Sequence, residues 1–206
     1  ISLCRDCKVP KRIHDWAPLV EAEKAKKVMI DHHPDPSDYC DVVISYTQIS
    51  STSEMIFRWI CRMGDFEVMS KASAEAIYTG MMTDTGGFTY NSNNAEIYYI
   101  IGELLKKGID KDKIYSNVYN NYSVDRYRML GYTLSEKMKI YSDYNSALIW
   151  LTKEEQNKYN SKKGDTEGFA NLPLNIKGII FAVFLREDNE MIKISLRSKG
   201  DFPSNK

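Results

Sequence analysis

The sequence predicts an α/β domain, built on a parallel sheet with helices on both faces, followed by a smaller α+β domain. Up to about residue 137, short apolar runs alternate with helical patterns, which is typical of parallel sheets. After residue 138, paired apolar runs flank polar turns, the pattern of β-hairpins. A chain of 206 residues, 43% of them hydrophobic, is long enough to bury such cores.

The elements of the first domain follow in order from these patterns. The apolar opening at residues 1–4 reads as a strand, and residues 15–26 predict a helix with Pro18 in its first turn. Two further apolar runs predict strands, and the first of them ends at Asp31. Apolar residues at helical spacing then predict helices at residues 50–63, 71–82, 94–107 and 124–137.

Two hairpins are expected in the second domain. Apolar runs within residues 140–152 flank the turn at residues 143–145, and the strands at 178–185 and 191–196 flank a polar turn. We therefore place the first domain at residues 1–124, a linker helix at 125–137 and the second domain at 138–206.

Composition excludes several classes of protein. The 28 basic and 28 acidic residues balance, whereas proteins that coat long nucleic acids carry a basic excess. Four cysteines make no disulfide framework, and the C-x-x-C of Cys4 and Cys7 lacks the second pair that a zinc site would need. With no run of 18 apolar residues and no signal peptide, we expect a cytoplasmic protein without a membrane partner.

The first candidate site is Asp31-His32-His33, at the end of a predicted strand. Open α/β sheets bind ligands at the carboxyl ends of their strands. An imidazole there can bind a metal, and an adjacent carboxylate can fix its tautomer. A polar turn before Pro34 explains the same residues equally well, so the triplet alone leaves both interpretations open.

A second candidate is the segment at residues 79–88, TGMMTDTGGF, where a helical pattern runs into small and hydroxylated residues. Asp84 is its one carboxylate, and Gly86 and Gly87 permit a tight turn or close approach to a ligand. A helix C-cap with an incidental aspartate is the competing interpretation.

Asp6 is the third candidate, although alone it would read as a solvated residue after a strand. Together, Asp6, His32 and Asp84 form a set of mixed oxygen and nitrogen donors. Carboxylate-rich sets of this kind favour manganese over zinc. Two such ions about 3.5–4 Å apart can hold both oxygens of a phosphoryl displacement.

These motifs jointly resemble the DHH-family phosphoesterases, and within them the nanoRNase and pAp-phosphatase group, relatives of the RecJ exonucleases. The DHH motif is Asp31-His32-His33, the later aspartate motif lies at residues 79–88, and an intervening aspartate corresponds to Asp6. Residues 164–171 and 195–199 are similar to segments of the DHH-associated domain. The resemblance covers essentially the whole chain and implies a DHH domain followed by a DHH-associated domain.

The resemblance implies a site for two Mn²⁺ ions, with Mg²⁺ as the alternative. Asp6 would bridge the ions, and His32 and Asp84 would complete the shell of one of them. His33 would contact the scissile phosphate, with Asp31 supporting it from behind.

Substrate binding is expected to involve the second domain as well. The resemblance implies that Arg197 and Ser198 bind a phosphate or terminal nucleotide across an interdomain cleft. It also implies a first metal-binding motif ahead of Ile1 and a glycine-rich motif after Arg197, both outside this sequence.

The expected function is hydrolysis of very short RNAs and of 3′-phosphoadenosine 5′-phosphate (pAp), and a homodimer is the candidate assembly. The alternatives are a RecJ-like exonuclease on long single strands, a phosphodiesterase of cyclic or linear dinucleotides, and a catalytically dead nucleotide-binding regulator. A long-strand enzyme should show a basic groove and an added oligonucleotide-binding domain, and the sequence shows neither.

Overall fold

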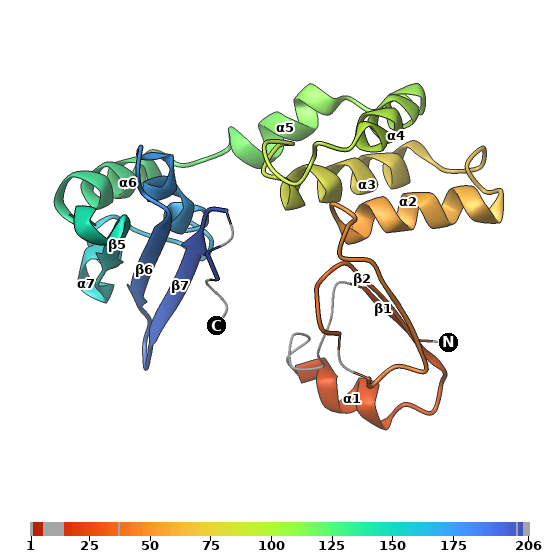
Figure 1. The fold of residues 1–206 in the computed structure, drawn as a ribbon, viewed down its shortest axis with the longest axis horizontal. Coiled ribbons are helices and arrows are strands. Elements are labelled where there is room, and N and C mark those ends of the chain that lie inside the picture. The colour runs from red at the N-terminus through yellow and green to blue at the C-terminus, as the bar shows by residue number, and fades with distance from the viewer. Residues whose placement is uncertain (1, 6–14, 37, 201, 204–206) are drawn as a thin grey trace. The chain divides into compact units, whose positions relative to one another are not determined.

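The computed structural model describes residues 2–5, 15–36, 38–200 and 202–203. It divides into two compact units, Ile1–Asn120 and Asn121–Lys206, drawn from red to green and from green to blue in Figure 1. The predicted α/β architecture is confirmed, with a parallel three-stranded sheet and helices in the first unit and a mixed four-stranded sheet in the second. Among the described helices, none is long and apolar enough to cross a membrane.

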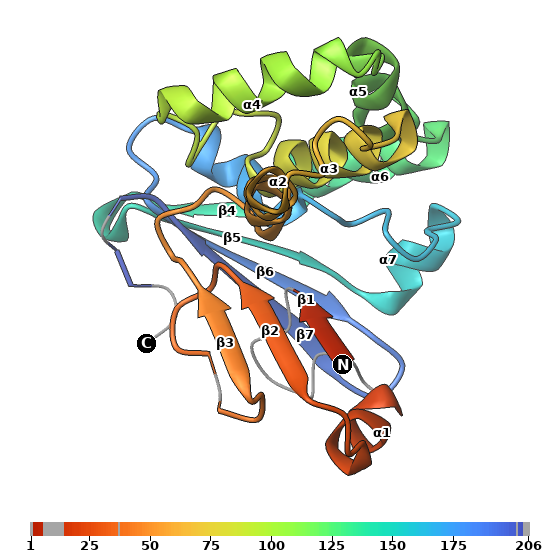
Figure 2. The same ribbon diagram turned by 90° about the vertical axis from the view of Figure 1, so that its right-hand side faces the viewer.

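The sheet of the first unit has β2 (Lys27–Asp31) at its centre, between β1 (Ser2–Arg5) and β3 (Val42–Ser45). All three strands are parallel, as Figure 2 shows. The second half of β2 is buried, which explains its apolar sequence. Parallel strands end at a common edge, so the residues that follow β2 lie in the middle of that edge, where open sheets bind ligands.

Helix α1 (Ala17–Ala22) is shorter than the predicted helix at residues 15–26. None of its described side chains is buried, and the backbone becomes extended at Glu23. Helical stability in proteins comes mostly from packing of an apolar face, so a helix without one stops early.

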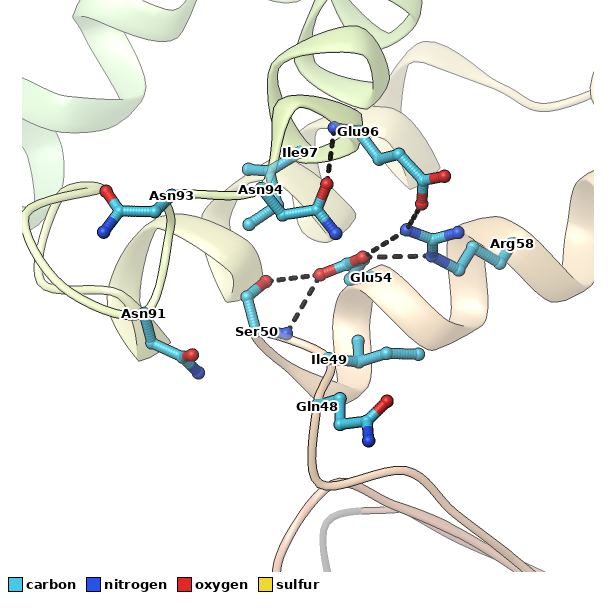
Figure 3. Close-up of a pocket in the computed structure, with 10 residues that line it drawn as sticks. All are labelled: Gln48, Ile49, Ser50, Glu54, Arg58, Asn91, Asn93, Asn94, Glu96 and Ile97. Atoms are coloured by element: carbon cyan, nitrogen blue, oxygen red, sulfur yellow. Dashed lines mark hydrogen bonds and ion pairs between the residues drawn. The ribbon is translucent and has the colours of Figure 1, made fainter.

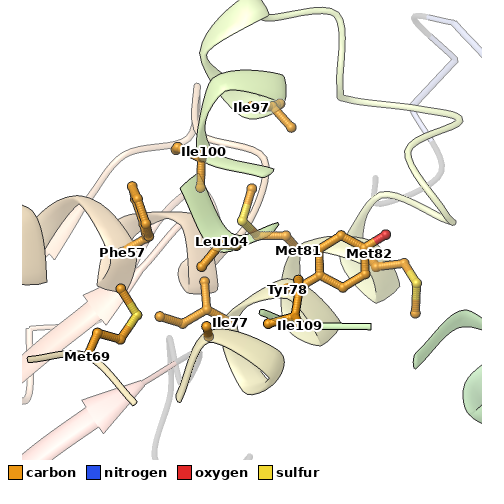
Figure 4. Close-up of a cluster of buried hydrophobic side chains, with 11 residues drawn as sticks. Phe57, Met69, Ile77, Tyr78, Met81, Met82, Ile97, Ile100, Leu104 and Ile109 are labelled. Atoms are coloured by element: carbon orange, nitrogen blue, oxygen red, sulfur yellow. The ribbon is translucent and has the colours of Figure 1, made fainter. Parts of the chain in front are cut away.

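Among the described residues of the first unit, four further helices surround a common core. They are α2 (Thr52–Met63), α3 (Lys71–Asp84), α4 (Ala95–Lys106) and α5 (Lys111–Tyr119). Each begins at a residue whose side chain accepts a backbone N–H of the first turn, which favours a helix start at that point. Helix α3 contacts the other three, and Figure 4 shows its Ile77, Tyr78, Met81 and Met82 among the buried side chains.

The second unit begins with α6 (Val124–Glu136), whose Met129 is fully buried against the sheet residues Ile149 and Phe184. The strands are β4 (Met138–Tyr141), β5 (Ser146–Leu151), β6 (Phe181–Glu187) and β7 (Ile192–Ser198), in that order. The outer pairs are antiparallel hairpins, whereas β5 and β6 run parallel. Between them lie α7 (Lys153–Lys158) and a 3-10 helix at Phe169–Asn175.

Candidate active site

Asp31, the last residue of β2, is completely buried and orients His33. Its Oδ1 accepts hydrogen bonds from the backbone N–H of His33 at 2.8 Å and from the imidazole Nδ1 at 2.7 Å. Burial pushes the pKa of Asp31 upward, but the hydrogen bonds from His33 outweigh it and bring the pKa below its ordinary value. Asp31 is therefore an anion that fixes the His33 ring.

The other oxygen of this carboxylate, Oδ2, is buried and has no hydrogen-bond partner among the described residues. Buried polar atoms in native structures are nearly always paired, so each exception calls for an explanation. An unpaired carboxylate oxygen at the end of the central strand indicates spare acceptor capacity close to the two histidines.

The ring of His32 contacts a backbone carbonyl through Nδ1. This nitrogen lies 3.4 Å from the carbonyl oxygen of Ile49, and because a carbonyl can only accept, the contact favours the tautomer with the proton on Nδ1. Nε2 then carries the lone pair, and it lies 3.6 Å from Oδ2 of Asp84. A backbone carbonyl on one imidazole nitrogen is the usual outer support of a metal-binding histidine.

Asp84 occupies an electrostatically unfavourable place, because it is the last residue of α3. The C-terminal end of a helix carries partial negative charge, and the last turn of α3 contains no basic residue. A carboxylate is retained at such a position most readily when a cation binds there. The sequence pattern had ended this helix at residue 82, so the two extra residues that place Asp84 on the helix are a finding of the structure.

Gly80 brings Asp84 to the site, one helical turn before it. A Cβ at Gly80 would lie 1.9 Å from Oγ and 2.8 Å from Cβ of Ser53 on α2. Only glycine therefore allows α3 to approach the start of α2 this closely. After the helix, Gly86 and Gly87 have positive φ angles of 55° and 72°, which confirms the tight turn expected of this pair.

The distance between His32 and Asp84 fits ligands of one divalent cation. Two donor atoms each about 2.0–2.2 Å from a common ion, at angles of roughly 90–120°, are about 3–3.7 Å apart. The separation of 3.6 Å falls in this range. One imidazole nitrogen and one carboxylate oxygen suit manganese or magnesium chemistry with additional oxygen ligands.

The expected third donor, Asp6, lies outside the described residues. Within residues 2–5, 15–36, 38–200 and 202–203, no group of three or more His, Cys, Asp or Glu side chains is arranged to hold a metal ion. The described part of the chain thus brings His32 and Asp84 together as a pair, with His33 beside them at a ring separation of 4.6 Å from His32.

Arg197 and Ser198 lie at the end of the edge strand β7, in the second unit. Arg197 is exposed, and its Nη1 donates to the carbonyl of the preceding residue at 2.8 Å. Ser198 donates its hydroxyl to the carbonyl of Phe202 at 2.7 Å. The guanidinium is therefore directed along the strand and retains donors for an anion.

Glu54, in the first turn of α2, is not among the residues singled out above, but its carboxylate is buried beside a polar cavity of about 390 Å³. Figure 3 shows the surroundings, in which Ser50 and Arg58 donate to the two carboxylate oxygens. Ile49, whose carbonyl holds His32, lines the same cavity. The signal available in the sequence was an acidic residue after the run Ser50 to Ser53, with an arginine four residues later.

The chain is similar to several known proteins. Residues 2–81 match the family model described as "DHH family, N-terminal domain". The bifunctional oligoribonuclease and PAP phosphatase NrnA of Bacillus subtilis is 27% identical over 178 residues, which are 85% of this chain and 56% of that protein. The NrnA of Thermus thermophilus is 24% identical over 173 residues, covering 84% and 51%. The chain thus spans about half the length of these curated relatives.

A crystal structure described as an exopolyphosphatase-related protein from Bacteroides fragilis has the same fold. It superposes with a TM-score of 0.94 at 63% sequence identity, over 98% of this chain and 59% of that one. With the DHH motif at the end of the central strand, residues 2–81 match the N-terminal domain of the DHH family, and the chain is distantly similar to the NrnA proteins.

Proposed function

We propose that this protein is a metal-dependent phosphoesterase that hydrolyses short oligoribonucleotides and pAp. The observation that carries the proposal is the pair formed by His32 Nε2 and Asp84 Oδ2, 3.6 Å apart at the end of the central strand. The NrnA relatives, named as oligoribonucleases and PAP phosphatases, support the choice of substrates. Manganese is the proposed ion, with Asp6 as the bridging ligand.

When bound, divalent cations would supply a water of lowered pKa and neutralise charge on the phosphoryl oxygens. In this proposal His32 and Asp84 bind one of the ions. Asp31 holds the imidazole of His33 through Nδ1, so that Nε2 is the nitrogen directed to a phosphoryl oxygen of the substrate.

The proposed role of residues 138–206 is that of a DHH-associated domain which holds the far end of the substrate. Arg197 would make a bidentate contact with a phosphate, and Ser198 would donate a further hydrogen bond. If this contact acts equally on substrate and transition state, Arg197→Ala should raise KM for pAp about tenfold or more with little change in kcat. An unchanged KM would remove Arg197 from the substrate site.

The deciding experiment compares substrates side by side, using the protein in its full length with Mn²⁺. The panel contains a dinucleotide, pAp, a cyclic dinucleotide, a long single-stranded oligonucleotide and inorganic polyphosphate, the last because of the name of the Bacteroides relative. We expect the highest kcat/KM on the dinucleotide and pAp. Faster hydrolysis of any other member would overturn the proposed specificity, and Mn²⁺ binding without turnover of any member would indicate a regulator.

A further inference from the structure

One peptide group, between Ile49 and Ser50, is held from both sides by side chains. Its carbonyl oxygen lies 3.4 Å from Nδ1 of His32. Its N–H donates to Oε2 of Glu54 at 3.0 Å, and the Ser50 hydroxyl donates to the same oxygen at 2.6 Å, as Figure 3 shows. A single peptide therefore connects the carboxylate of Glu54 to the imidazole of His32.

Glu54 is a buried charged residue, with only 1% of its surface exposed. Its second oxygen, Oε1, accepts from Nε of Arg58 at 3.0 Å and from Nη2 at 2.7 Å. Burying an ion pair costs desolvation energy, and an apolar pair of similar size is often at least as stable. Stability alone is thus a weak reason for a carboxylate at this position.

Helix capping does not explain the contact with Ser50 either. In a capping box, the third residue of the helix accepts from the N–H of the N-cap residue. The N-cap here is Ser51, whose hydroxyl accepts from the N–H of Glu54 at 3.1 Å. The carboxylate of Glu54 instead reaches one residue further back, to the peptide that His32 uses.

We propose that Glu54 is a positioning residue for His32, acting through the Ile49–Ser50 peptide to keep the proton on Nδ1 and to direct Nε2 toward Asp84. Donation of the Ser50 N–H to a carboxylate polarises the peptide and makes the Ile49 carbonyl a stronger acceptor. The arrangement resembles the carboxylate–histidine support of metal sites, with a peptide group inserted between the two side chains. The role rests on the proposed function, in which His32 binds a metal ion.

The test substitutes Glu54→Gln, which keeps the size of the side chain but leaves one acceptor oxygen for donors from both Ser50 and Arg58. Outer-shell changes of this kind typically cost 10–100-fold in metal affinity, and we expect a loss in that range for Mn²⁺. Free Mn²⁺ is measured by electron paramagnetic resonance during titration of the full-length protein.

A second measurement needs no metal. Nitrogen-15 spectra of the imidazole rings report which nitrogen carries the proton, and His32 is assigned with single substitutions at the other two histidines of this sequence. In the wild type we expect the proton of neutral His32 on Nδ1. In Glu54→Gln we expect a smaller Nδ1-protonated population.

Glu155→Gln is the matched control, because Glu155 is a carboxylate whose hydrogen-bond partners Tyr132, Lys137 and Thr152 all lie in the second unit. It should lower thermal stability without changing Mn²⁺ affinity or the His32 tautomer. Glu54→Asp is a second variant that keeps the charge but is one methylene too short for Ser50, and we expect the same direction of change.

Wild-type Mn²⁺ affinity and a wild-type tautomer in folded Glu54→Gln would overturn the positioning role and leave Glu54 as scaffold. Failure of both Glu54 variants to fold would lead to the same conclusion. Absence of Mn²⁺ binding in the wild type would instead count against the proposed function, while the metal-free tautomer comparison would still decide whether Glu54 positions His32.

Discussion

Two carboxylates, Glu155 of the second unit and Asp31 of the first, differ in how completely they are hydrogen-bonded. In the second unit, Glu155 accepts from the hydroxyl of Tyr132, from Nζ of Lys137 and from the backbone of Thr152, so both oxygens are paired. In the first unit, one oxygen of the Asp31 carboxylate accepts two hydrogen bonds, and the other has no hydrogen-bond partner among the described residues. A fully paired carboxylate stabilises the fold, whereas one with remaining acceptor capacity is suited to a ligand.

The unpaired buried groups of the two units also differ, because one is a hydrogen-bond acceptor and the others are donors. Among the described residues, the unpaired buried side-chain atoms are an oxygen of Asp31 in the first unit and Nε of Arg126 and Arg186 in the second. Other nitrogens of the two guanidiniums donate hydrogen bonds. Arg126 donates to the carbonyl of Glu167, and Arg186 donates to the hydroxyl of Thr166. Spare acceptors suit a cation and spare donors suit an anion.

The largest effect is expected from Asp84→Asn, which removes a proposed ligand from the first unit. We expect kcat/KM to fall roughly 1,000-fold or more, since a metal contributes several kcal/mol to transition-state stabilisation, and Mn²⁺ affinity to fall with it. Hydrolysis of pAp and Mn²⁺ titration measure the two effects.

Asp112→Asn, at an exposed position of α5, is the matched control and should leave both quantities unchanged. Activity retained in Asp84→Asn would show that the carboxylate at the end of α3 serves the fold rather than a ligand.

Gly80→Ala should have the next largest effect, because its Cβ would collide with Ser53. Overpacking of this kind typically costs 1–3 kcal/mol, and here it would also move Asp84 away from His32. We expect a loss of about 2 kcal/mol in the free energy of unfolding, measured by denaturant titration, together with weaker Mn²⁺ binding.

Gly102→Ala provides the contrast, since its Cβ position on α4 has no described atom within 4 Å apart from the adjoining helix backbone and the two chain neighbours. Alanine there should stabilise the unit by about 0.5–1 kcal/mol. Equal effects of the two substitutions would contradict a special close approach at Gly80.

Glu155→Gln should have a smaller effect, confined to the stability of the second unit. Loss of charge-assisted hydrogen bonds at this partly exposed group is expected to cost about 1–2 kcal/mol after solvent screening. Fluorescence of Trp150 on β5, with the tryptophans of the first unit replaced by phenylalanine, would report the unfolding of this unit.

Glu155 should also make the stability of the second unit depend on pH under acidic conditions. Burial raises the pKa of Glu155, but bonds from Lys137, Thr152 and Tyr132 outweigh it and lower the pKa from 4.5 to about 2. The contribution is therefore complete above about pH 4.5 and is lost as the pH falls toward 2. The free energy of unfolding reported by Trp150 fluorescence should fall over that pH interval in the wild type, and it should fall less in Glu155→Gln. Identical acid profiles would remove Glu155 from the stabilising network.

The amino-acid sequence alone determined the α/β architecture, the motif of Asp31, His32 and His33 at a strand end, and the turn at Gly86 and Gly87. These features depend on neighbouring residues, through apolar periodicity and the conformational freedom of glycine. Helices α5 and α7 went unpredicted because they are short and mostly exposed, with little apolar pattern to mark them.

Only the tertiary structure decided which candidates meet. His32 and Asp84 are 52 positions apart, and their approach depends on the packing of α3 against α2 at Gly80. The contact of Glu54 with the peptide that holds His32 likewise requires the loop after β3 to fold back onto the start of α2. Such distances are set by the shapes of several packed elements at once, and no local pattern of residue types records them.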